Sequence, residues 1–332
     1  MIRDFPCSAD KNGADLLEFD TDIVFPDVHF CAEKMAQFAL ETKAHSGTEF
    51  CMLPFCHTVE AEALGAVINH GDCKNGPRVR DYACRTVDDL LNLPPLEFDK
   101  GRIAEVLKAC KILETEGETV VLEITGPLTL LSSLIDPMRI FRAMRKEPEK
   151  MNEVFEKIRK NIIAFALEAE KNGVTIISYA DPTGGVSIVG PAVMDVMVKN
   201  FTAPLLKELD RALKAETLVN LCPKTAFALI DTGCAEVMET ECEANVGYGK
   251  ICKQMRGKTR FVGHTCIKNT SFRTGAKIGV IKQKQEKNYE RKRTTFQNDR
   301  GRKNRPPTVY LPGRHDEYDY DRIDGACRDK PA

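Results

Sequence analysis

Short apolar runs alternate with longer amphipathic segments from about residue 27 to residue 281. Short runs of apolar residues are typical of buried parallel strands, and apolar residues that recur at spacings of three and four are typical of helices. The expected strands are 49–53, 119–124, 175–178, 217–221, 235–239 and 260–262. The expected helices include 32–44, 104–114, 151–171 and 191–213.

A Pro, Gly, Asp or Cys lies within three residues of the end of each expected strand, as when strand ends are reserved for a site. In a (β/α)8 TIM-type barrel the chemistry gathers at the carboxyl ends of the strands. The alternation therefore predicts an α/β fold, namely a (β/α)8 TIM-type barrel. Six or seven strands can be recognised where such a barrel has eight, with the first and last in doubt, so an incomplete barrel is the alternative.

The two ends of the chain lack this pattern. After Gln283 the Val, Leu and Ile residues are Val309, Leu311 and Ile323, which is too little apolar surface to offset the entropy of ordering a segment. We expect an irregular N-terminal segment at 1–24, the barrel domain at 25–282 and a disordered tail at 283–332. A basic run at 290–293 favours a solvated tail over a nucleic-acid contact.

Composition narrows the class of protein. The 332 residues carry 48 Lys and Arg against 49 Asp and Glu, and the net charge of -1 gives no reason to expect nucleic acid as a partner. No apolar run is long enough to predict a membrane span, and no secretory leader is apparent, so a cytoplasmic location is expected. The 13 cysteines lack the spacing of a disulfide scaffold and favour a reducing compartment, with most of them as small buried hydrophobes.

Three strand ends carry candidate site residues. Residues 53–65 are expected to form a strand, a turn that includes His57 and a helix, with Thr58 as a plausible N-cap and Glu60 and Glu62 in the first turn. Helix capping alone is an alternative explanation for these two glutamates.

The second strand end, around Gly126, offers backbone amides, and the third places Asp181 before Gly184 and Gly185. Two glycines allow the backbone to approach a ligand closely, although an ordinary Asp-Pro turn explains the same pattern.

A metal site is the sharpest hypothesis from spacing. Cys222 follows the strand at 217–221, and Cys266 follows the strand at 260–262 with His264 two residues earlier. Thiolates and an imidazole suit Zn²⁺, and an open coordination position would admit a substrate thiol. The predicted ligands are therefore Cys222, His264 and Cys266, with buried structural thiols as the competing interpretation.

At these residues the chain resembles the uroporphyrinogen decarboxylase superfamily, and more specifically its methylcobamide:coenzyme M methyltransferase branch, over about residues 25–282. The resemblance rests on residues 25–29, 54–55 with 60–65, 125–127 with 130–135, 180–182 and 221–222.

This resemblance implies a barrel whose mouth holds zinc, bound by a His-x-Cys pair and a later Cys. The zinc would activate a small thiol that takes a methyl group from a methyl-corrinoid on a partner corrinoid protein. Cys222 matches the Cys of the pair, and Cys266 is the candidate for the later one. Asp181 and Glu60 would position the thiol or corrinoid as catalytic groups. The predicted cofactor contacts are His57, Gly126, Gly184 and Gly185.

The chain departs from that branch in three places. Asn220 stands where the His of the pair would be, and an amide is a poor zinc ligand. The spacing from Cys222 to Cys266 is short for the branch, and its amino-terminal Arg-Pro-Pro segment is not recognisable before Phe25. His264 would have to replace the missing imidazole.

Two other functions stay open. A porphyrinogen decarboxylase would use Asp181 on a pyrrole nitrogen, but Arg78, Arg80 and Arg85 are isolated charges expected on a helix or loop, not a clamp for carboxylates. A degenerate relative would bind a corrinoid protein without turnover. The metal content of the purified protein, with Cys222→Ala as control, separates these readings.

The tail allows one more hypothesis. Codons for residues 308–320, shifted by one nucleotide, permit a segment that resembles the amino-terminal opening of the same branch. Residues from about Gln283 onward would then be read out of frame. Stop codons in the shifted frame would rule this out.

Overall fold

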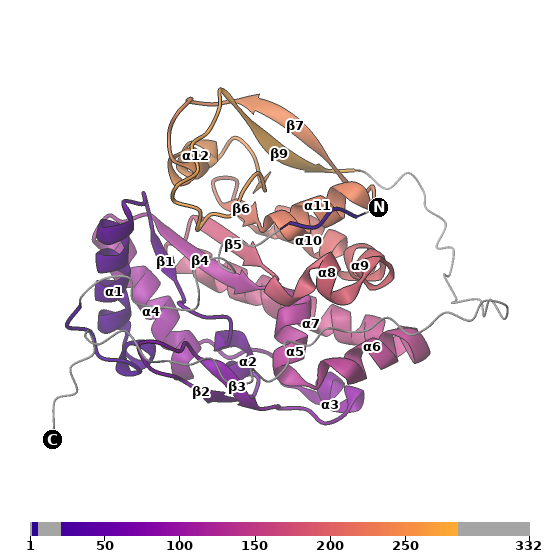
Figure 1. Cartoon of the computed structure of the whole chain (residues 1–332). Coiled ribbons are helices and arrows are strands. Elements are labelled where there is room, and N and C mark those ends of the chain that lie inside the picture. Colours follow the sequence, from indigo (N-terminus) through magenta and orange to yellow (C-terminus); the bar gives the residue numbers. More distant parts are fainter. Residues whose placement is uncertain (1, 6–20, 285–332) are drawn as a thin grey trace, which may run out of the picture.

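Five parallel strands lie side by side in one sheet. In spatial order they are β1 (Cys51–Leu53), β4 (Val120–Thr125), β5 (Ile176–Ala180), β6 (Leu218–Leu221) and β8 (Phe261–Val262), of which Figure 1 labels the first four. The computed structural model describes residues 2–5 and 21–284. Every residue of β4 is buried, as are all of β6 and most of β5. Strands covered on both faces need such apolar runs, which is why these strands were predictable from the sequence.

Helices cover the sheet. In chain order they are η2 (Asp27–Phe30), α1 (Ala32–Ser46), α2 (Val59–Ala63), α3 (Val87–Asn92), α4 (Gly101–Thr115), α5 (Pro127–Leu134), α6 (Pro137–Lys146), α7 (Pro148–Lys171), η3 (Pro182–Gly184), α8 (Val186–Val189), α9 (Pro191–Met197), η4 (Val198–Thr202), α10 (Ala203–Ala212), α11 (Pro223–Asp231) and α12 (Tyr248–Met255). Helices α1 and α4 pack beside β1, and α7 packs against β4. None of the helices in the described ranges is long and apolar enough to cross a membrane.

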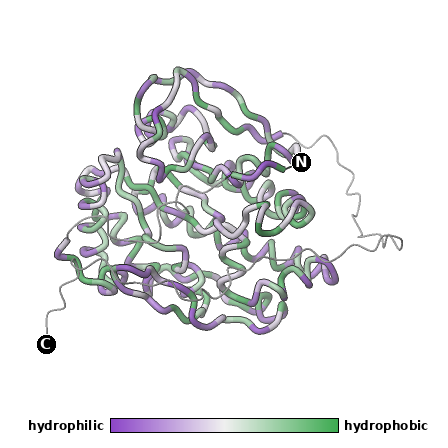
Figure 2. Tube along the Cα trace, viewed as in Figure 1, coloured by the Kyte–Doolittle hydropathy of each residue, from purple (hydrophilic) through white to green (hydrophobic). Residues whose placement is uncertain are grey.

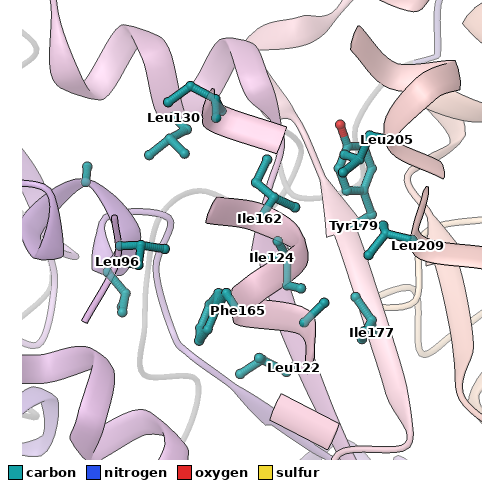
Figure 3. Close-up of a cluster of buried hydrophobic side chains, with 14 of the residues drawn as sticks. Leu96, Leu122, Ile124, Leu130, Ile162, Phe165, Ile177, Tyr179, Leu205 and Leu209 are labelled. Carbon is teal, nitrogen blue, oxygen red and sulfur yellow. The ribbon is translucent and has the colours of Figure 1, made fainter. Parts of the chain in front are cut away.

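The main core lies between these helices and the sheet (Figure 3). Leu122 and Ile124 of β4 point toward Phe165 of α7, which is fully buried and stacks on Phe98 at a centroid distance of 6.0 Å. Burying such side chains is the main stabilising contribution and fixes the sheet that positions the strand ends.

The far edge of the sheet differs from a barrel. Strand β9 (Lys277–Gln283) pairs antiparallel with β8, and β7 (Ala235–Glu241) pairs antiparallel with β9 at the edge. Among the described residues β7 pairs with β9 alone and β1 with β4 alone, so a complete barrel is not confirmed. The expectation that residues 235–239 form a parallel strand is wrong. Most of β7 is exposed, and its hydropathy is mixed (Figure 2), which suits an edge and not a barrel interior.

Two further expectations need correction. Residues 67–81 form an antiparallel pair, β2 (Val67–Asn69) and β3 (Arg78–Asp81), so Arg78 and Arg80 lie on a strand, while Arg85 precedes α3.

The segment expected as one helix at 191–213 is divided into α9, a π-helical turn η4 and α10. Pro204 has no N–H to bond the Asn200 carbonyl, and Arg159 donates to that carbonyl instead at 3.1 Å.

The ends of the chain are described only in part. Residues 2–5 lie on α11, where Arg3 bonds Asp231 and Phe5 meets Phe227 edge-on. The expected disordered, out-of-frame tail and most of the segment 1–24 lie outside the described residues.

His29 of η2 is 2% exposed and contacts Phe25 and Phe55. Burial, with smaller contributions from Arg102 and His70, lowers the pKa of His29 to about 4. In the unfolded chain the pKa is about 6.5, so the unfolded state binds this proton first. Neutral His29 therefore costs the folded state nothing at a pH above the pKa of the unfolded chain. As the pH falls from that pKa toward the lower pKa of the folded chain, the unfolded state gains a proton that the folded state does not, and stability is lost.

We therefore expect the free energy of unfolding to fall by about 2 kcal/mol through this group between about pH 7 and pH 5. His29→Leu should flatten that part of the pH profile in urea titrations. The exposed His264→Asn is the control and should keep the profile of the parent. An unchanged profile in His29→Leu would contradict the assignment.

Candidate functional site

The carboxyl ends of the parallel strands meet at one end of the sheet, which we call the mouth. His57 follows β1, Thr125 ends β4, Asp181 follows β5 and Cys222 follows β6. The segment after β8 carries His264 and Cys266 to the same end of the sheet. The topology thus brings together the strand ends that the sequence analysis singled out.

Glu60 ties the first of these ends to the second. Its carboxylate accepts from the Thr125 N–H at 2.7 Å and from the Thr125 hydroxyl at 3.0 Å, and it is 1% exposed. Burial raises the pKa of Glu60, and the bonds from Thr125 oppose that shift. Helix α2 does begin after Thr58, but the Thr58 hydroxyl accepts from Arg102 at 2.7 Å and caps nothing. Because Glu60 lies three residues after His57, its bonds to β4 also fix the turn that carries His57.

Asp181 ties the β5 end to helix α5. It accepts from the Thr129 N–H and hydroxyl, both at 2.7 Å, and from the Leu128 N–H at 3.3 Å. Burial raises the pKa of Asp181 despite these bonds. A Cβ placed on Gly126 would lie 2.4 Å from Asp181 Cβ, and one on Gly184 would lie 2.4 Å from Asp181 Oδ2. These two glycines therefore make room for Asp181. At Gly185 the nearest atom is the flexible Lys224 side chain, at 3.4 Å.

A buried polar row crosses the sheet one layer below the mouth. Glu123 of β4, Ser178 of β5 and Asn220 of β6 pair in register, so their side chains share one face, and each is at most 4% exposed. We did not predict Glu123 or Ser178 as site residues. The available signal was a polar residue in the middle of an otherwise apolar strand.

Two side chains approach Glu123. Lys268, from the segment after β8, donates to it at 2.9 Å, and His57 Nδ1 lies 3.3 Å from Glu123 Oε1. Burial alone would raise the pKa of Glu123, but Lys268 and His57 outweigh it and hold the pKa below its usual range. His57 Nδ1 is buried without a well-aligned hydrogen bond. Its ring also lies close enough to Glu60 and Asp181 to lower both of their pKa values when protonated.

The side chain of Asn220 accepts a hydrogen bond from a tyrosine. Its Oδ1 accepts from the Tyr248 hydroxyl at 2.9 Å, and both residues are 1% exposed. Nothing in the sequence pattern identified Tyr248, because it lies at the start of a helix far from the strand ends in sequence.

The predicted metal ligands are not assembled. Within residues 2–5 and 21–284, no three His, Cys, Asp or Glu side chains come together in a way that could hold a metal ion. His264 is exposed, its Nδ1 accepts from the Gly279 N–H at 3.4 Å, and its ring packs on Phe272. Cys222 and Cys266 are half-buried and form no disulfide. Zinc therefore does not fit the donors as they are arranged.

A cavity of about 500 Å³ lies at the opposite end of the sheet, below the amino ends of β4, β5 and β6. Its lining mixes Lys111, Lys214 and Arg256 with Glu118 and Glu170. Charges of both signs favour neither an anion nor a cation, and the cavity is distant from the mouth.

The chain is similar to several methyltransferases. It is 26% identical over 262 residues to "Methylcobamide:CoM methyltransferase MtaA" of Methanosarcina barkeri, covering 78% of this chain and 76% of that one. It is 29% identical over 211 residues to MtbA of Methanosarcina mazei, covering 62% and 61%. A solved methyltransferase from Methanosarcina mazei shares the fold with a TM-score of 0.54, at 24% identity over 64% of this chain and 63% of that one.

Residues 17–263 match the family described as Uroporphyrinogen decarboxylase (URO-D), and the match ends one residue before His264. Cys266 and Lys268 thus lie beyond the matched part, whereas His57, Glu123, Asp181 and Asn220 lie within it. The predicted resemblance is confirmed over most of the chain. This chain belongs to the uroporphyrinogen decarboxylase (URO-D) family.

Proposed function

We propose that this chain transfers a methyl group from a methylated corrinoid, carried by a partner corrinoid protein, to a small thiol. The observation that supports this most is the His57 imidazole at the mouth, facing the buried carboxylate of Glu123. A thiol is a weak nucleophile until it loses its proton, and an imidazole oriented by a carboxylate can take that proton. The methyltransferases to which the chain is similar are named for methylcobamide and CoM.

In the proposed reaction His57 takes the proton of the thiol, and the sulfur attacks the methyl carbon. The sulfur–carbon bond forms as the cobalt–carbon bond of the corrinoid substrate breaks, and the bonding pair stays with cobalt. Glu123 orients His57 and stabilises the imidazolium, while Lys268 helps to keep Glu123 ionised. His57 Nδ1 and Glu123 Oε1 are 3.3 Å apart, so a small movement of the imidazole brings them to ordinary hydrogen-bond distance.

Glu60 and Asp181, which we predicted as catalytic groups, are positioning residues in this proposal. Their carboxylates accept hydrogen bonds from Thr125, Thr129 and Leu128, so they hold the turns around the mouth. Gly126 and Gly184 leave the space that the Asp181 side chain fills. His57 and Gly185 remain the predicted contacts of the corrinoid.

The direct test is an anaerobic assay with the full chain, methylcobalamin as methyl donor and coenzyme M as thiol. Loss of the methylcobalamin spectrum should match formation of the methyl thioether, measured by mass spectrometry. A methylated corrinoid protein should serve in the same assay. Binding of that protein without turnover would replace the proposal by the degenerate-relative reading, and turnover of uroporphyrinogen instead would replace it by the decarboxylase reading.

A further inference from the structure

Position 220, where the resemblance expects a metal-binding histidine, holds an asparagine that is hydrogen-bonded to Tyr248. Asn220 and Cys222 lie two residues apart around the end of β6, and the resemblance would place a His at 220. Here the position carries an amide, 1% exposed, whose Oδ1 accepts from the Tyr248 hydroxyl at 2.9 Å. An amide oxygen is a poor ligand for Zn²⁺, and this one has a hydrogen-bond donor where a metal would need a lone pair.

The Tyr248 side chain also reaches a third element. Its hydroxyl joins β6 to helix α12 through Asn220. Phe272, in the segment after β8, packs edge-on against the Tyr248 ring at a centroid distance of 6.1 Å. The Tyr248 side chain therefore contacts both β6 and the segment after β8.

The segment after β8 is fastened at a second point. Lys268 donates to Glu123 of β4 at 2.9 Å, across a separation of 145 residues. In the sheet, β5 and β6 lie between β4 and β8, so this ion pair joins strands on either side of them. Cys266 lies between Lys268 and His264, whose Nδ1 accepts from the Gly279 N–H at 3.4 Å and whose ring packs on Phe272. Protein groups thus hold the segment that a metal shared by Cys222 and Cys266 would otherwise hold.

We infer that this chain has replaced the resident metal of its mouth by a hydrogen-bonded clamp, Asn220 with Tyr248, and that it folds and holds Cys266 in place without zinc. The clamp exists whether or not the chain transfers methyl groups. Its tests therefore read metal content and local structure, and they can fail while the proposed methyl transfer holds, or the reverse.

The first test measures metal in the full chain, purified anaerobically under reducing conditions, exposed to excess Zn²⁺ and desalted. We expect less than about 0.1 zinc per chain, because too few donors converge to hold the ion. Titration with Co²⁺ should give no thiolate-to-cobalt absorption. Any zinc that remains should be the same in Cys222→Ser. About one zinc per chain that is lost in Cys222→Ser would overturn the inference.

The second test removes the clamp. Tyr248→Phe deletes one hydroxyl and should lower Tm by about 4 °C, with or without EDTA. It should also raise the alkylation rate of Cys266 by iodoacetamide roughly fivefold, measured against Cys234 in the same digest as internal reference. Tyr82→Phe, an exposed tyrosine, is the matched control and should change neither. An unchanged Cys266 rate in a folded Tyr248→Phe, or a Tm of the parent that falls in EDTA, would contradict the clamp.

Discussion

Replacing His57 with glutamine is expected to lower kcat/KM for thiol methylation by about a thousandfold near neutral pH, because the substrate thiol then loses its proton acceptor. The loss should shrink as the pH rises through the range where an ordinary thiol ionises unaided, about pH 8.5. A pH series of methyl-thioether formation measures both effects. Folding should be intact, since the side chain is partly exposed and forms no aligned hydrogen bond.

His264→Gln is the matched control for this experiment. It removes an imidazole from the same end of the sheet, but one that is exposed and turned to Phe272. The proposal requires that its rate stay within about threefold of the parent. A deficit in His57→Gln that persists unchanged at high pH would show that His57 has another role. A large loss in His264→Gln would favour the predicted metal ligands.

Replacing Gly126 with alanine is expected to destabilise the chain by about 4 kcal/mol, the largest stability effect we anticipate for a single methyl group. The new Cβ would lie 2.4 Å from Asp181 Cβ and 3.1 Å from Asp181 Cα. The backbone must therefore move, and the hydrogen bonds that Asp181 accepts from α5 must weaken. Urea denaturation followed by circular dichroism measures the difference, and methyl transfer should fall with it.

Gly185→Ala is the comparison that separates crowding from a role in ligand binding. Its Cβ would meet the flexible end of Lys224 at 3.4 Å and Ser187 Oγ at 3.6 Å, so the stability of the variant should stay within about 0.5 kcal/mol of the parent. Equal losses in the two variants would contradict the assignment of Gly126 to Asp181. A stable Gly185→Ala with weaker corrinoid binding would support the predicted cofactor contact.

The sequence predicted the central strands well because burial on both faces demands uninterrupted apolar runs, as in β4 and β5. It did not reveal β9, whose residues 277–283 include glycine, lysine and glutamine, or the direction of β7. Strand direction depends on which neighbour completes the sheet, and that is a long-range choice. Here β8 pairs with β6 directly, which leaves β7 to pair with β9.

The candidate site was predictable where a residue follows a strand, as with His57, Asp181 and Cys222. It was not predictable where contacts join distant segments. Lys268 reaches Glu123 and Tyr248 reaches Asn220, and in neither case does spacing along the chain hint at the partner. Asn220 was recognised as an unsuitable ligand from the sequence, but only the structure shows what its amide does instead.

The open sheet has a consequence for how copies of this chain meet. A closed barrel has no unpaired strand edge, whereas β7 leaves one side of its backbone without a strand among the described residues. Val237 and Met238 are exposed on that strand beside Glu236, Glu239 and Glu241. Glu239 is paired with Lys277 of β9, while Glu236 and Glu241 give two such edges the same charge and so oppose edge-to-edge aggregation. The protection of strand edges that a barrel obtains from closure therefore rests here on charged side chains of one strand.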